Sequence, residues 1–309
     1  MSTPAAPRVL VLLAAYNGAR WITEQLESIL CQSGVNVHVV IRDDGSTDET
    51  PRLLAAIAND PRVTIASAGA PSGSAAQNFF CLIRESSAEQ FDYVAFSDQD
   101  DVWHPQKLRT ATVALAAGDW AGYSCATTAV WPDGRTMQLR QSPHPTRADF
   151  LFEGAGQGCT FLLKAELYRR FRAFIREDPA LTGHLHYHDW SVYAVARAWG
   201  LRWFFDPRSF LNYRQHAGND TGARGNWPGL RRRLLLIRSG WYGTQLRAMA
   251  VLCRRAAPGN SMIGEWHGLL TRPAGSLRRL QMARFCLRGG RRRTRDNVIL
   301  VLSALRGWI

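Results

Sequence analysis

The chain has 309 residues, 46% of them hydrophobic, which is enough for one large domain or for a domain with a substantial appendage. Its six cysteines lie far apart and form no CxxC pair, so the composition excludes a disulfide framework and favours buried free thiols in a reducing compartment. The net charge of +13 is uneven, because residues 224–309 carry about +16 and residues 1–223 about −3.

Strands and helices alternate over the first hundred residues. Apolar runs predict buried strands over 8–15, 36–41, 63–66 and 91–97. Helical spacing of apolar residues predicts helices over 21–31, 47–59 and 75–85. This order is typical of a parallel sheet with helices on both faces.

The pattern is looser after residue 105. A helix is predicted over 105–117, then a strand over 120–131 that ends at a Pro-Asp-Gly turn. Helices are expected over 161–174 and 189–199, a strand over 201–205 and a loop over 219–229. In the basic C-terminal part, four apolar residues follow one another at helical spacing: Leu230, Leu234, Ile237 and Trp241. We therefore expect an α/β sheet domain followed by a basic helical extension.

Three aspartates, Asp98, Asp100 and Asp101, follow the fourth predicted strand. Carboxylates this close repel one another unless a cation or solvent relieves them, and a hard divalent cation commonly bridges such carboxylates to phosphates. A solvated acidic turn is the alternative explanation. The position at the carboxyl end of a buried strand, where open α/β sheets bind ligands, favours a site for Mg²⁺ or Mn²⁺.

The turns after the first two strands carry groups suited to a nucleotide. Tyr16 offers an aromatic face for stacking, and Asp43 and Asp44 offer carboxylates for a base or a ribose. Either turn alone is also explained as the capped start of a helix. Because the carboxyl ends of parallel strands meet at one edge of a sheet, these turns and the acidic cluster together predict a ligand site.

Five segments together resemble the family 2 glycosyltransferases, in particular the bacterial rhamnosyltransferase-like branch. They are Ala15-Tyr16-Asn17, Asp43-Asp44-Gly45-Ser46, Phe96-Ser97-Asp98-Gln99-Asp100-Asp101-Val102-Trp103, His188-Asp189-Trp190 and Tyr213-Arg214-Gln215-His216. The resemblance covers about residues 8–220, roughly 70% of the chain. It implies an α/β fold of the Rossmann-like GT-A type and transfer of a sugar from a nucleotide diphosphate with inversion at the anomeric carbon. The branch implies dTDP-rhamnose, or else a UDP-sugar, as donor, and a glycan or lipid-linked glycan of cell-surface polysaccharide synthesis as acceptor.

The resemblance also implies roles for individual residues. The donor would be bound by Ala15, Tyr16, Asn17, Asp43, Asp44, Asn78 and Asp98. Asp100 and His216 would hold the metal. Asp189 would be the base that takes the proton of the acceptor hydroxyl, although an Asp at a helix start is also a common N-cap. The acceptor would contact Trp103, Gly158, His188 and Trp190.

On this basis the chain divides into two parts. Residues 1–223 would form the catalytic domain, with a nucleotide-binding half over 8–104 and an acceptor half over 105–223. Residues 224–309 would form an arginine-rich helical tail. The tail could lie on an anionic membrane, bind nucleic acid through its arginine triplets, or form a solvated surface. No nucleic-acid-binding module is apparent, so no nucleic acid is expected. Membrane contact is preferred because the resemblance implies acceptors that are often lipid-linked glycans.

His184, His186 and His188 alternate, which places three imidazoles on one face of an extended segment. A zinc site is one interpretation, and a polar rim of the acceptor site is the preferred one. The sequence contains neither a signal peptide nor an apolar run near the roughly 20 residues of a membrane span. We therefore expect a cytoplasmic protein, bound at most peripherally to the inner face of the plasma membrane.

Two other classes of protein are alternatives to a glycosyltransferase. A sugar-1-phosphate nucleotidyltransferase has a similar sheet and metal requirement, but residues 15–20 lack the Gly-rich, basic loop that we would expect of it. A non-catalytic protein that binds membrane or nucleic acid would need only the tail. That explanation leaves the acidic turns without a role.

Overall fold

The computed structural model describes residues 5–67, 69–216 and 227–309, which fall into two compact units. Unit 1 consists of residues 1–141, 156–177 and 202–222, and unit 2 of residues 142–155, 178–201 and 223–309. Two segments that we placed in the acceptor half, 142–155 and 178–201, therefore pack with the C-terminal helices. The functional boundary at residue 223 stays a prediction.

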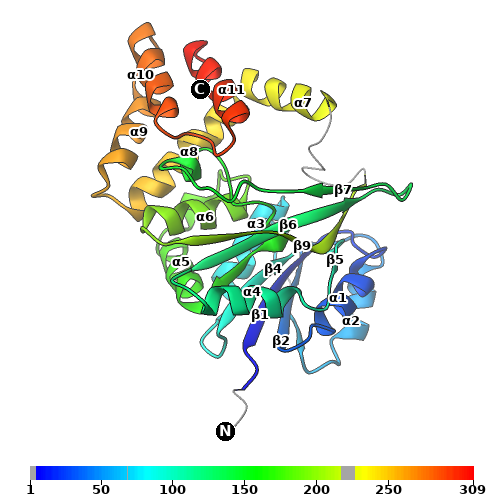
Figure 1. Ribbon diagram of the computed structural model, residues 1–309. Coiled ribbons are helices and arrows are strands. Elements are labelled where there is room, and N and C mark those ends of the chain that lie inside the picture. Colours follow the sequence, from blue (N-terminus) through cyan, green and yellow to red (C-terminus); the bar gives the residue numbers. More distant parts are fainter. Residues whose placement is uncertain (1–4, 68, 217–226) are drawn as a thin grey trace. The chain divides into compact units, whose positions relative to one another are not determined.

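Unit 1 contains a mixed sheet with helices on both of its faces (Figure 1). Its strands are β1 (Arg8–Ala15), β2 (Asn36–Asp43), β3 (Val63–Ile65), β4 (Tyr93–Ser97), β5 (Val102–Trp103), β6 (Gly122–Val130), β7 (Thr136–Leu139), β8 (Leu162–Lys164) and β9 (Trp203–Arg214). Its helices are α1 (Ile22–Leu30), α2 (Thr50–Ile57), α3 (Ala75–Glu85), α4 (Lys107–Ala116) and α5 (Ala165–Glu177), with a short 3-10 helix over Gly158–Thr160.

The described strands follow the order β3-β2-β1-β4-β8-β6-β9-β5, with β7 beside β6. The first four are parallel, as the alternation of strands and helices predicts. In their register Ala15 lies beside Asp43, and Leu13 lies beside Ser97. The turns after β1, β2 and β4 therefore leave the sheet at the same edge.

The central strands of the parallel half, β1 and β4, are buried on both faces. Alternate residues of β1, such as Val11 and Leu13, join one hydrophobic core with Leu26 of α1 and Leu108 of α4. The intervening residues face α3 and α5, which cover the other side of the sheet and contact each other. This explains why β1 is a continuous apolar run rather than an alternating one.

The second half of the sheet differs from the prediction at four strands, of which β5 and β7 have no counterpart in it. Residues 162–164, predicted as the start of a helix, form β8, which is antiparallel to β4 and β6, because a short apolar run fits a buried strand as well as a helix. The strand predicted over 201–205 continues through Pro207 to Arg214 as β9. The register with β6 shifts there, and such a bulge tolerates a proline inside a strand.

Unit 2 consists of helices. They are two short 3-10 helices over Asp149–Leu151 and Pro179–Thr182, followed by α6 (His188–Ala198), α7 (Trp227–Arg238), α8 (Trp241–Ala256), α9 (Ser261–Thr271), α10 (Ser276–Leu287) and α11 (Thr294–Leu305). The predicted helical extension is confirmed. The apolar spacing over 230–241, however, spans two helices, because Gly240 adopts a left-handed conformation (φ 79°) and separates α7 from α8.

Part of the loop predicted over 219–229 lies outside the described residues, and residues 227–229 already belong to α7.

All six cysteines are free thiols, four of them buried. Among the residues that the structure describes, no helix combines the length and the apolar character that a membrane span requires.

Candidate active site

The turn after β1 connects the turns that follow β2 and β4. The Tyr16 backbone N–H donates to Gln99 Oε1 (2.8 Å), and Gln99 Nε2 donates to the Tyr16 carbonyl (2.7 Å). On its other side, Asn17 N donates to Ser46 Oγ (2.7 Å), and Thr47 N donates to Asn17 Oδ1 (2.8 Å). Asn17 has a positive φ of 48°, a conformation that Asn tolerates better than most residues. The three predicted turns thus form one hydrogen-bonded surface.

Three of the predicted donor-binding side chains lie on this surface. Tyr16 is 55% exposed, so a face of its ring is available for stacking. Asp43 is partly buried, and its carboxylate accepts hydrogen bonds from the backbone and the hydroxyl of Ser46. Asp98 is also partly buried and begins the acidic turn. Their roles in donor binding stay predictions.

Asp44 and Asn78 have a different environment, because both are buried around Arg42. Arg42 Nη1 donates to Asp44 Oδ1 (2.6 Å) and to Asn78 Oδ1 (2.8 Å). Burial alone would raise the pKa of Asp44, but hydrogen bonds from Ser72 and Arg42 outweigh it and lower that pKa. Asn78 Nδ2 donates to the carbonyl of Ala15 (3.2 Å). These side chains hold the ends of β1 and β2 in place, so any influence on the donor would be indirect.

The two predicted metal ligands, Asp100 and His216, come together although 116 residues separate them. His216 Nε2 lies 2.7 Å from Asp100 Oδ2, and the two side chains are 18% and 13% exposed. The imidazole stacks on Trp21, with ring centroids 4.2 Å apart and planes 17° apart. A carboxylate oxygen and an imidazole nitrogen, accessible and close together, suit a divalent cation such as Mn²⁺.

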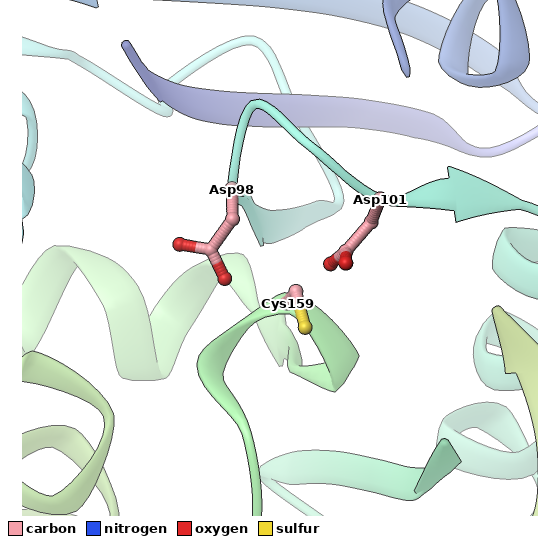
Figure 2. A group of neighbouring side chains, drawn as sticks. All are labelled: Asp98, Asp101 and Cys159. Carbon is pink, nitrogen blue, oxygen red and sulfur yellow. The ribbon is translucent and has the colours of Figure 1, made fainter. Parts of the chain in front are cut away.

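A second cluster lies deeper, where Cys159 faces Asp98 and Asp101 (Figure 2). One ligand atom from each residue lies within 4.8 Å of the others. Asp101 has no exposed surface, and the Cys159 thiol is the hydrogen-bonding side chain beside its carboxylate. Burial, reinforced by Asp100 and Asp98, raises the pKa of Asp101 well above its usual range. Burial and the same acidic turn also raise the pKa of the Cys159 thiol.

The two clusters differ in their fitness for Mg²⁺ or Mn²⁺. A buried thiol with a raised pKa stays protonated, and the thiolate is the form that binds metals. Hard cations also prefer oxygen ligands to sulfur. The pair Asp100 and His216 is therefore the better candidate for the metal, and Asp101 is a buried group behind it.

Lys107, at the start of α4, is another buried charge in this region. It is 2% exposed, and its Nζ lies 3.4 Å from the centroid of the Trp103 ring. Burial lowers the pKa of Lys107 to about 8. No local pattern predicts this burial, because a lysine in the first turn of an amphipathic helix is usually solvated.

Replacing Lys107 by methionine should change how stability depends on pH. Between pH 8 and 10.5 the unfolded wild-type chain still binds the lysine proton, whereas the folded chain has lost it. The free energy of unfolding of the wild type, relative to the Lys107→Met variant, should therefore rise by about 3 kcal/mol across this range. Urea denaturation at several pH values measures the difference, with Lys164→Met as the matched control. A difference that stays constant from pH 8 to 10.5 would contradict the prediction.

The predicted base, Asp189, belongs to unit 2 and lies in the first turn of α6. It is partly exposed, and its Oδ1 accepts a hydrogen bond from the Trp190 backbone N–H (2.6 Å). The residue that precedes the helix as N-cap is Tyr187, so the alternative role of Asp189 as N-cap is not observed. The positive end of the helix dipole favours a carboxylate at this position.

A buried ion cluster supports the helix that carries Asp189. Asp149 has no exposed surface and accepts hydrogen bonds from two residues of α6, Tyr193 Oη (2.6 Å) and Arg197 Nη1 (3.2 Å). Asp149 also accepts a hydrogen bond from Arg292 Nη1 (2.8 Å). The other terminal nitrogen of Arg292, Nη2, donates to the carbonyl of Gly154 (2.6 Å). One arginine of the basic tail is therefore a structural partner of α6 and of the 149–154 segment.

The predicted acceptor residues are mostly buried. Trp103 is 2% exposed and part of the core of unit 1, and Gly158 lies buried in a 3-10 helix. Trp190 is 5% exposed, and its Nε1 donates to the Phe150 carbonyl (2.8 Å). Burial lowers the pKa of His188 to about 3, so this imidazole is neutral at physiological pH. Their burial favours a supporting role for these side chains, and contact with an acceptor stays a prediction.

The alternating histidines do not share one environment. His188 is buried, His184 is exposed, and the ring of His186 packs edge-on against Trp241 with centroids 5.2 Å apart. Among the described residues, no group of potential metal ligands includes them. The zinc interpretation therefore has no structural support.

Comparison with known proteins agrees with the resemblance seen in the motifs. Residues 10–178 match the family model for glycosyl transferase family 2. The chain is also similar to the dTDP-rhamnosyl transferase RfbG of Shigella flexneri. The two are 34% identical over 240 residues, which is 77% of this chain and 83% of that protein.

Two solved structures share the fold. S. aureus TarS in complex with UDP has a TM-score of 0.54 and 14% identity, over 90% of this chain and 70% of that one. The mannosyltransferase PcManGT from Pyrobaculum calidifontis, in complex with GDP-Man and Mn²⁺, has a TM-score of 0.51 and 16% identity, over 98% and 88%. At such low identity they show the fold alone, and it is the predicted GT-A type. Both the family model and the relative from Shigella confirm the predicted family, and the chain belongs to the family 2 glycosyltransferases.

Proposed function

We propose that the protein transfers rhamnose from dTDP-rhamnose to a hydroxyl of a glycan or lipid-linked glycan in the synthesis of a cell-surface polysaccharide. The observation that carries the proposal is the convergence at one sheet edge of Tyr16, Asp43 and Asp98 with the pair Asp100 and His216. This edge offers an aromatic face for stacking on the base and carboxylates for the nucleoside. It also offers two side chains that would hold the metal ion for the diphosphate. The choice of sugar rests on the similarity to RfbG, which is a dTDP-rhamnosyl transferase.

The proposed reaction is a single displacement with inversion. The acceptor oxygen forms a bond to the anomeric carbon as the bond from that carbon to the diphosphate oxygen breaks, and the hydroxyl proton passes to the Asp189 carboxylate. Asp43 and Asp98 would orient the nucleoside, and Tyr16 would stack on its base. Asp100 and His216 would hold Mg²⁺ or Mn²⁺, which when bound would neutralise the negative charge of the diphosphate.

A donor screen tests this function. The purified chain is incubated with dTDP-rhamnose, UDP-glucose, UDP-GlcNAc and GDP-mannose, with Mn²⁺ or with EDTA, and the released nucleoside diphosphate is measured. Release of dTDP that depends on Mn²⁺ and exceeds release from the other donors supports the proposal. Preference for a UDP-sugar would show that dTDP-rhamnose is not the donor. The absence of turnover and of thermal shift with every donor would count against a transferase.

We also propose that the enzyme works at the inner face of the plasma membrane. A lipid-linked acceptor would be found there, and anionic lipids attract basic segments. The charge of about +16 over residues 224–309 supports this location. A nucleotidyltransferase and a purely binding protein, the two alternatives, are disfavoured by membership of the family.

A further inference from the structure

Exposed apolar side chains concentrate on two helices of unit 2. Of the ten large hydrophobic side chains that are exposed in the described parts of the chain, six lie on α10 and α11: Leu277, Leu280, Leu287, Val298, Leu302 and Leu305. Their exposed fractions run from 41% to 68%. The two helices pack against each other, so these side chains belong to one local structure (Figure 1).

The exposed residues form one row on each helix. On α10 the apolar residues 277, 280 and 287 are spaced three and seven apart, and exposed Arg284 fills the gap in their row. On α11 the apolar residues 298, 302 and 305 have the same kind of spacing, and exposed Arg295 extends the row by one turn.

Each helix already has another apolar face that is packed inside the unit. On α10 it contains Met282, Phe285 and Cys286, and on α11 it contains Leu300 and Ala304. A helix in a water-soluble domain normally keeps one apolar stripe and a polar opposite face. A second apolar row on each of two adjacent helices therefore indicates a surface that is covered by a partner.

The charge around the rows identifies the partner. Residues 276–306 contain nine arginines and one acidic residue, Asp296. Arg291 and Arg292 are used inside the unit, where they pair with Glu153 and Asp149. Exposed arginines also lie in the rows, at 284 and 295, and near them, at 279, 288 and 306, where Arg288 is 4.0 Å from Glu265.

We propose that α10 and α11 form a docking surface for an anionic lipid bilayer. The exposed apolar side chains of the two rows would lie among the acyl chains, and the exposed arginines would lie at the headgroups. Leucines flanked by arginines are the composition of helices that lie in a membrane interface. A second copy of the chain is a worse occupant, because it would bring two arginine-rich faces together. This inference depends on the proposed peripheral location and is independent of which sugar is transferred.

Flotation with lipid vesicles tests the surface. The full chain is mixed with phosphatidylcholine vesicles with or without phosphatidylglycerol, neither of which contains an acceptor. We expect binding to the anionic vesicles that weakens as salt increases. The double variant Leu280→Ser/Leu302→Ser should reduce the bound fraction about tenfold. The double variant Arg284→Gln/Arg295→Gln should reduce it on anionic vesicles only.

The control is Val113→Ser/Val251→Ser, which changes two apolar side chains that are 62% and 49% exposed on α4 and α8. These variants all alter exposed positions, so their melting temperatures should stay close to that of the wild type. Equal loss of binding in this control, or no binding of the wild type to anionic vesicles, overturns the proposal. So does a dimer of the wild type on size-exclusion chromatography that the leucine variant dissociates, because the rows would then bind a second copy.

The two proposals fail separately. Donor hydrolysis is measured in the same samples without vesicles, and it should be equal in the wild type and in the Leu280→Ser/Leu302→Ser variant. Vesicle binding without hydrolysis counts against the transferase alone, and hydrolysis without vesicle binding counts against the docking surface alone.

Discussion

Replacing Asp189 by asparagine is expected to lower the rate of sugar transfer by about 10²- to 10⁴-fold. Asparagine has nearly the same shape and can still accept the hydrogen bond from the Trp190 backbone N–H, but it cannot take the proton of the acceptor hydroxyl. Single-turnover transfer from the donor measures the chemical step, and calorimetry with dTDP measures donor binding. Donor binding should be unchanged, because the proposed nucleoside site lies on residues of unit 1.

Asp178→Asn is the matched control for this variant. Asp178 is a partly buried aspartate of the same unit that accepts a backbone hydrogen bond from Ala180 (3.2 Å). The same chemical change there should leave transfer within about twofold of the wild type. If Asp178→Asn loses as much activity as Asp189→Asn, or if Asp189→Asn transfers sugar normally, Asp189 is not the base.

The second large effect is expected at Asp100. Asp100→Asn should abolish the dependence of dTDP binding on Mn²⁺ and should lower transfer by about 10²- to 10³-fold. The reason is that the amide supplies no negative charge to the pair with His216, which lies 2.7 Å away. Calorimetric titration of Mn²⁺ into the protein, with and without dTDP, gives a measure that does not depend on turnover.

Asp133→Asn provides the comparison, since Asp133 is an exposed aspartate of unit 1 whose partner is Arg135 in a hairpin. It should bind Mn²⁺ and dTDP as the wild type does. His216→Gln should weaken Mn²⁺ binding in the same direction as Asp100→Asn. Normal Mn²⁺ binding in both site variants would instead point to the deeper cluster of Asp98, Asp101 and Cys159.

The parts of the fold that were predictable from the sequence are those with local patterns. The first four strands are rich in apolar residues, β1 without a break from Val9 to Ala15, and the parallel order brought Tyr16, Asp43 and Asp98 to one edge as expected. The long strand β9 was not predictable beyond Phe205. Pro207 interrupts its pattern, and only pairing with β6 carries the strand past it.

The orientation of individual side chains was harder to predict than their position in a motif. Asp43 and Asp44 are neighbours in the sequence, yet Asp43 remains partly accessible whereas Asp44 points into a buried ion pair with Arg42. The sequence patterns do not predict a role in the site for Trp21 or Gln99. In the structure the Trp21 ring stacks on His216, and the Gln99 side chain hydrogen-bonds to the backbone of Tyr16. Contacts of this kind depend on partners far away in the chain, which a local pattern does not contain.

The basic tail shows the same limit. Its arginines looked equivalent in the sequence, and charge alone assigned all of them to a surface. In the structure Arg292 is 9% exposed and neutralises Asp149, whereas Arg284 and Arg295 are exposed beside leucine rows. Similar residues in one segment thus have two separate uses, one inside the protein and one on its surface.

The ion pair between Asp149 and Arg292 also has a consequence for the order in which the enzyme matures. Arg292 follows Asp149 by 143 residues, so at about 5–20 residues per second a ribosome needs roughly 7–30 s to make the second partner after the first. For most of that interval a carboxylate that is fully buried in the finished protein has, among its ion-pair partners in the described residues, Arg197 alone to neutralise it. The turns after β1, β2 and β4, which carry the proposed nucleoside-binding residues, come much earlier in the chain. A nascent chain would therefore contain the turns after β1, β2 and β4 first, and the helix bearing the proposed base would be fully neutralised only after Arg292 had been made.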